Sequence, residues 1–176
     1  LSNAQDSVAS VIADRRIRGD FDGSDAHTDR AVARGLMTTA EGQEQKLANA
    51  RGREKKDVED QVLTDPYAAE TNFATRKFDT EGDRDKAIKA AQQRQHYVEN
   101  TTIDEFYNKI SAGVDVTEDE IEAAFHPDAA VSRVKVQDHL REYNSLSTKA
   151  RRATPQYQQR IMGDLMAGLA SLDVSK

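Results

Sequence analysis

The chain has 176 residues, of which 32% are charged and 37% hydrophobic, and its formal net charge is −6. It contains no cysteine, which excludes a disulfide framework, a thiolate nucleophile and a cysteine-ligated metal, and which suits a reducing compartment. The acidic balance argues against a general affinity for nucleic acid or anionic membranes. The small apolar share predicts a thin core and therefore an elongated protein of one domain, or of one domain with an extended arm.

The N-terminal segment predicts two helices, over 4–18 and 25–34, which end at Gly19 and Gly35. The stretch Ser2–Ala4 resembles the remnant of a cleaved expression tag, and we expect the chain to be a fragment of a longer protein. No signal peptide is visible, and no apolar run approaches the length of a membrane span. Because little apolar surface is available in residues 1–35, this segment either packs on the core or extends as an arm.

Acidic residues around Gly23 suggest a calcium loop at first sight, since Asp20, Asp22 and Ser24 carry oxygen ligands. An EF-hand loop needs its glycine after the third ligand position and a glutamate at its end, and Gly23 comes too early. We therefore interpret this stretch as a polar turn between helices.

A long charged helix is predicted over 40–63 in the N-terminal half of the chain, and it begins at a capping box of Thr38 and Glu41. Its apolar residues form only a narrow seam, made of Leu47, Ala50, Val58, Val62 and Leu63. A rod with so little apolar surface needs a partner along one line, as in a helical hairpin or a coiled coil. The partner is either another segment of this chain or another subunit.

Prolines and threonines predict where the following helices begin. Pro66, Pro127 and Pro155 each suit a first helical turn, and Asp65 and Thr154 are good N-caps. Thr117 and Glu120 form a second capping box, and Thr80 and Asp83 form a weaker one. Gly113 is expected to end a helix. The predicted helices of this half cover 66–78, 81–99, 101–112, 118–125, 128–150 and 155–172.

Three apolar faces at helical spacing are expected to pack together as the core of the C-terminal half. They comprise Ile103, Phe106, Tyr107 and Ile110; Val131, Val134, Leu140, Tyr143 and Leu146; and Tyr157, Ile161, Met162, Leu165, Met166, Leu169 and Leu172. Strand signals are nearly absent. The sequence therefore predicts an all-α fold, an elongated multi-helix bundle. Residues 1–63 would form the N-terminal helices and 64–176 the C-terminal bundle, or both would form one continuous domain.

No catalytic, cofactor-binding or metal-binding residue is predicted, and we expect no enzymatic activity and no cofactor. The four histidines lack the i, i+4 spacing of a helical zinc site, and the chain has no nucleophile elbow, P-loop or dinucleotide-binding glycine motif. An unrecognised enzyme would need a polar pocket, for which His126, His139 and Tyr143 are the candidates. The basic residues of 51–56 and 149–152 are interpreted as solvated faces, which makes nucleic-acid binding an unfavoured alternative.

One layout has a familiar pattern. The stretch 31–41 gives a short helix, Gly35, Thr38 and Glu41, and a long charged helix then leads to Asp65-Pro66-Tyr67-Ala68-Ala69. A second helix–turn–helix phrase spans 110–121. About half the chain thus resembles helical segments of the internal virion or ejection proteins of tailed phages and prophages. No catalytic residues carry over from this resemblance.

The resemblance implies a structural or interaction segment of a larger phage- or prophage-derived particle protein, acting through helix surfaces, in the cytoplasm or in the virion. The alternative is a helical adaptor or regulatory protein-binding module of a bacterial protein. Both expect a protein partner, and the first expects self-association. A small-molecule ligand is neither indicated nor excluded.

Overall fold

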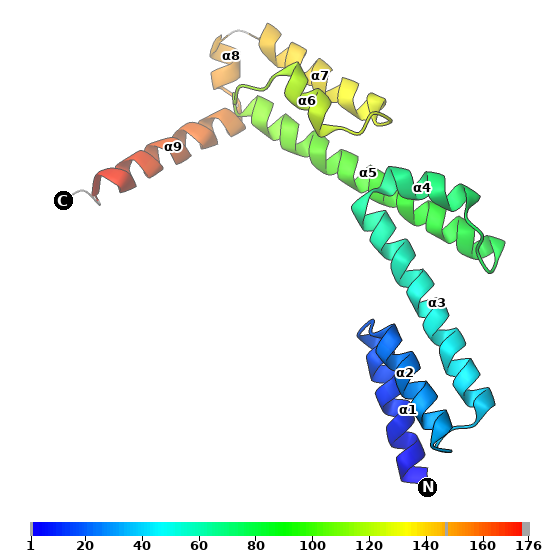
Figure 1. The fold of residues 1–176 in the computed structure, drawn as a ribbon. Helices are drawn as coiled ribbons and strands as arrows, with labels where there is room; N and C mark the ends of the chain where they lie inside the picture. Colours follow the sequence, from blue (N-terminus) through cyan, green and yellow to red (C-terminus); the bar gives the residue numbers. More distant parts are fainter. Residues whose placement is uncertain (1, 147, 174–176) are drawn as a thin grey trace. The chain divides into compact units, whose positions relative to one another are not determined.

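The computed structural model describes residues 2–146 and 148–173, with side chains described for 6–146 and 148–167. These residues form helices and no strand, so the predicted all-α class is confirmed (Figure 1). The helices are α1 (Ser2–Ile17), α2 (Phe21–Ala33), α3 (Thr39–Thr64), α4 (Pro66–Thr75), α5 (Glu81–Ser111), α6 (Glu118–Ala124), α7 (Ala130–Ser145), α8 (Thr148–Arg152) and α9 (Pro155–Asp173).

Contacts group the chain into two units, Leu1–Ala91 and Gln92–Lys176. The division therefore falls inside α5, later in the chain than the expected boundary between 63 and 64. The reason is a shared apolar cluster, in which Val62 at the end of α3 packs with residues of α4 and of the start of α5.

The first half of unit 1 is a helical hairpin on a long helix: α1 and α2 run antiparallel side by side, and α2 packs against α3 (Figure 1). Helix α1 is followed by Gly19, whose φ of 76° suits glycine, and Asp20 then caps α2 by accepting a hydrogen bond from the Gly23 amide at 3.0 Å. The second helix therefore begins at Phe21 and not at 25 as predicted. Gly23 and Ser24 belong to its first turns and not to a turn between helices.

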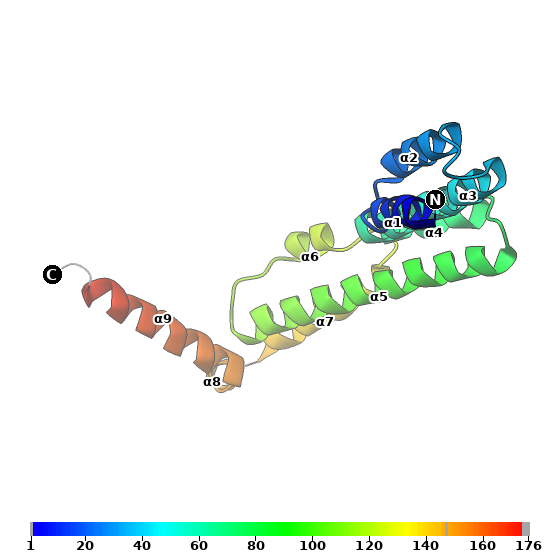
Figure 2. The same cartoon turned by 90° about the horizontal axis from the view of Figure 1, so that it is seen from below.

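The second half of unit 1 is held by apolar side chains. Phe73 is fully buried in the cluster formed with Val62, Ala69, Ala87 and Ala91, and its ring meets that of Phe78 edge-on at 5.9 Å between centroids. Helix α4 begins as predicted, with Asp65 accepting from two backbone amides and Pro66 in the first turn. Figure 2 shows the same helices from below.

Unit 2 has its core where α6 and α7 meet the C-terminal part of α5. The buried residues are Phe106, Ile110, Val116, Ile121, Phe125, Ala129, Val136, Leu140 and Tyr143. The predicted capping box starts α6, and Gly113 has a φ of 69° just after α5. Two of the three predicted apolar faces thus supply this core, although Val131, Val134 and Leu146 of the second face are exposed.

Further predicted helix boundaries are wrong. The expected helices 81–99 and 101–112 are one helix, α5, because the hydroxyls of Thr101 and Thr102 each bond a carbonyl one turn back, at 2.9 Å, and leave the backbone helical. The expected helix 128–150 is divided into α7 and α8, since Leu146 is extended. Pro127 does not open a helix: it lies in a turn before α7, whose N-cap is Ala129.

The apolar face of α9 does not join the core, contrary to the prediction. Ile161, Met162, Leu165 and Met166 are all exposed, between 43% and 62%. Tyr157, in the first turn of α9, contacts Gly113 and is half-buried. Leu169 and Leu172 of the same predicted face lie outside the described side chains.

Candidate functional site

The most organised polar arrangement in the described structure lies between α2 and α3. Three acids follow one face of α2 at positions i, i+3 and i+7, namely Asp22, Asp25 and Asp29. Lys46, Asn49 and Arg53 follow one face of α3 with the same spacing. The two rows meet in antiparallel register, with the first acid beside the last base. We call these six residues the polar zipper.

Asn49 is the centre of the polar zipper and is fully buried. Its amide nitrogen donates to Oγ of Ser24 at 2.9 Å and to Oδ1 of Asp25 at 2.7 Å. The hydroxyl of Ser24, also fully buried, donates to the Ile12 carbonyl at 3.1 Å and lies 3.2 Å from Oδ1 of Asn49. Asn49 therefore links α3 directly to α2, and Ser24 extends the link to α1.

Arg53 completes the zipper at one end. Its guanidinium donates to Asp25 at 2.7 Å and to Asp22 at 2.8 Å, and it lies over the Phe21 ring, 5.6 Å from the centroid. Burial alone raises the pKa of Asp25, but hydrogen bonds from Asn49 and Arg53 and the charges of Arg53 and Lys46 outweigh it and lower that pKa. Asp25 is thus held in its ionised form.

The opposite end of the zipper is more exposed. Nζ of Lys46 lies 2.6 Å from Oδ1 of Asp29, and the two side chains are 45% and 63% exposed. Arg16 of α1 adds a hydrogen bond of 3.2 Å to Gln45 beside them. Pairs with this exposure contribute little individually, so the linked contacts of Asn49, Asp25 and Arg53 carry most of the stabilisation.

Two glycines let the hairpin approach α3 closely. A Cβ atom on Gly42 would lie 2.6 Å from Cγ2 of Val32, and one on Gly52 would lie 2.5 Å from Cε1 of Phe21. Any larger residue at these positions would push α2 away and lengthen the bonds of Asn49 and Arg53. The face of α3 that meets α2 is therefore built of glycine and polar groups.

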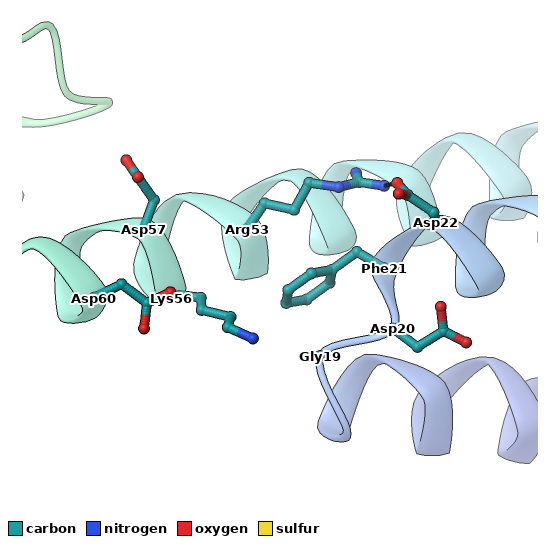
Figure 3. Close-up of a pocket in the computed structure, with 8 residues that line it drawn as sticks. All are labelled: Gly19, Asp20, Phe21, Asp22, Arg53, Lys56, Asp57 and Asp60. Carbon is teal, nitrogen blue, oxygen red and sulfur yellow. Dashed lines mark hydrogen bonds and ion pairs between the residues drawn. The ribbon is translucent and has the colours of Figure 1, made fainter.

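A charged pocket of about 360 Å³ opens beside Arg53, between the α1–α2 turn and α3 (Figure 3). Figure 3 shows Lys56 reaching toward Gly19 and Phe21 while Asp57 points away from them. Hydrogen bonds from Arg76 and Gln61 lower the pKa of Asp57, which makes it a weaker base than an ordinary aspartate. A general acid or base at neutral pH needs the opposite shift, so Asp57 is not suited to that role. The pocket is lined by Gly19, Asp20, Phe21, Asp22, Arg53, Lys56, Asp57 and Asp60.

A larger groove of about 540 Å³ in unit 1 has an apolar floor and a charged rim. Val58 of α3, Phe78, and Ala87 and Ala90 of α5 form the floor. The rim carries both signs of charge, from Arg51, Glu54, Lys55, Glu59, Asp79, Asp83 and Lys86. The groove suits an apolar side chain or helix better than a polar metabolite.

The described contacts do not unite the candidate enzyme residues. The ring of His126 accepts a hydrogen bond from the Asp128 amide in the turn before α7. His139 stacks on Tyr107, with ring centroids 4.2 Å apart, and Tyr143 lies under the guanidinium of Arg151. Among the described residues, no three metal-ligating side chains come together.

Most of the basic side chains of 51–56 form ion pairs with carboxylates. Arg51 pairs with Asp79, Lys55 pairs with Glu59, and Arg53 belongs to the polar zipper. In the second basic segment, the guanidinium of Arg151 donates to the carbonyls of Leu146 and Asn144.

The polar zipper was missed from the sequence, although a signal was present. Matched rows of opposite charge at i, i+3 and i+7 on consecutive helices predict an antiparallel pairing, with Asn49 between Lys46 and Arg53 as the buried link. The predicted apolar seam of 40–63 is not the face by which α3 packs on α2. Leu47, Ala50 and Leu63 are exposed, and of the seam only Val58 and Val62 pack inward.

Comparison with known protein families, curated proteins and solved structures finds no match to this chain. Across residues 2–146 and 148–173, none of the helices is both long enough and apolar enough to cross a membrane.

Proposed function

We propose that this chain is a non-enzymatic helical segment of a larger phage- or prophage-derived particle protein, and that it acts through its helix surfaces. The observation that carries the proposal is the apolar face of α9, where Ile161, Met162, Leu165 and Met166 are exposed together. Four large apolar side chains on one exposed helix face are typical of a surface that a protein partner covers. The helix–glycine–capped helix layout that resembles phage internal proteins supports the particle reading.

The charge distribution of α9 favours self-association over an oppositely charged partner. In a chain with 32% charged residues, the described side chains of α9 include one base, Arg160, and one acid, Asp164. Two copies of a neutral apolar face meet without the repulsion that a net charge of −6 imposes elsewhere.

Light scattering coupled to size exclusion over a concentration series tests the proposal. We expect a defined oligomer, and we expect Ile161→Gln with Leu165→Gln to raise its dissociation constant at least about tenfold, since each apolar side chain loses its buried contacts. Leu47→Gln with Leu63→Gln is the matched control, because both leucines are exposed on α3, and it should leave the oligomer intact.

A monomer at every concentration would contradict self-assembly and favour the alternative, a helical adaptor. The apolar groove floored by Val58, Phe78, Ala87 and Ala90 supports that alternative, since it offers a site for a partner helix.

A further inference from the structure

We infer that the α1–α2 hairpin is a releasable arm, locked onto α3 by the charges of the polar zipper. The inference is independent of the α9 face and of the proposed function. It rests on what lies between the hairpin and α3, on the connection between them, and on the exposure of the charged groups.

The contact between hairpin and α3 has little apolar content on the α3 side. Between Thr39 and Arg53, the buried residues of α3 are Gly42 and Asn49. On the hairpin side, Val32 and Phe21 face Gly42 and Gly52, which present no side chain to them. Docking on α3 therefore depends on hydrogen bonds and ion pairs more than on the hydrophobic effect.

The hairpin has hydrogen bonds and an ion pair of its own that do not involve α3. The Ser24 hydroxyl bonds the Ile12 carbonyl, the Asp20 amide donates to the Arg15 carbonyl at 2.9 Å, and the Arg15 guanidinium pairs with the Asp20 carboxylate at 2.6 Å. One short connection, Arg34–Thr38, joins it to α3, and Gly35 within it has a φ of 70° and no neighbour within 4 Å of its Cβ position. The arm can therefore turn about this connection as a unit.

The ion pairs of the polar zipper are exposed enough for salt to screen them. The Asp25 side chain is 25% exposed and that of Arg53 is 39% exposed, while Asp22 is almost fully exposed. Ion pairs with this exposure weaken as ionic strength rises, whereas buried apolar contacts do not. Release exposes Lys46, Asn49 and Arg53 of α3, which can then bind a helix with acids at the spacing of Asp22, Asp25 and Asp29.

Two spin labels test the inference directly, since the chain has no cysteine of its own. Ala26→Cys on α2 and Ala50→Cys on α3 are exposed positions outside the zipper. Double electron–electron resonance on the labelled full chain should give one narrow distance at low salt. In Asp25→Asn or Arg53→Gln, or in 1 M NaCl, a broad and longer second distance should appear, with its population raised about tenfold.

Glu59→Gln is the matched control: it removes an exposed carboxylate that pairs with Lys55 within α3, outside the polar zipper and the charged pocket, and should leave the narrow distance unchanged. Far-UV circular dichroism on the same samples separates release from melting, because a released arm keeps its helices. A narrow distance that persists in both zipper variants at high salt would overturn the inference. Broadening accompanied by an equal loss of helix would also overturn it, since the zipper would then only hold the fold.

Discussion

The two halves of α3 pack against their neighbours by different means. Its first half meets α2 through glycines, Asn49 and charged groups, while its last turns place Val62 in an apolar cluster around Phe73. One continuous helix therefore carries a contact made by hydrogen bonds and ion pairs at one end and a contact made by buried apolar side chains at the other. The first is specific in register but sensitive to the solvent, and the second is insensitive to salt and pH.

The largest effect is expected at the apolar end. Phe73→Ala removes a fully buried ring and leaves a cavity among alanines that cannot close it, which should lower the free energy of unfolding of unit 1 by about 3–5 kcal/mol. Phe73→Leu is the control and should cost less, because it keeps most of the volume. Urea denaturation followed by circular dichroism measures both. Equal, small losses for the two variants would show that the cluster contributes little.

A smaller loss is expected at the polar end. Asn49→Ala leaves the buried Ser24 hydroxyl and Asp25 without their amide partner, which should cost about 1–3 kcal/mol. Hydrogen exchange should localise the loss to α2 and the first half of α3, with α4 still protected. Gln43→Ala, at an exposed position of the same helix, is the control and should change neither. Uniform loss of protection across α4 would contradict a division between the two halves of α3.

The smallest effect is expected from pH, and at the polar end it should act through Asp25. Because the pKa of Asp25 is lowered in the folded chain, its ionised form contributes stability above the pKa of an unfolded aspartate, and this is lost as pH falls below about 4. The protection factors of α2 amides, which correct for the slower intrinsic exchange in acid, should fall on acidification. In Asp25→Asn this fall should vanish, and an unchanged profile would assign the acid sensitivity to another carboxylate.

Local signals predicted much of this fold. The capping boxes at Thr38 and Thr117, the N-cap Asp65 and the glycine stops depend on neighbours within a few residues, and the structure has them where they were expected. Packing faces depend on distant residues and were less predictable. Leu47 and Ala50 were assigned to a seam on the assumption that α3 buries its apolar residues, whereas α2 offers acids there and selects Lys46, Asn49 and Arg53.

Continuity of helices was also hard to predict, because it depends on side chains that bond their own backbone. Asn100, Thr101 and Thr102 form a polar stretch that suggests a break, yet the threonine hydroxyls bond carbonyls within the helix. For α9 the prediction of burial was wrong. Its apolar spacing is that of a buried helix, but the face is exposed, because spacing alone does not say what a helix packs against.

The antiparallel register of the polar zipper ties residues that are far apart in sequence. Arg53 meets two aspartates of α2, and Lys46 meets a third, so a reversal of charge at one position is compensated only by the opposite reversal at its partner. Divergence at these positions is thus constrained, because the paired residues have to change together. Distant relatives that keep this α2–α3 pairing would then be recognised by exchanged pairs of charges, together with small residues at 42 and 52, and not by any conserved single motif.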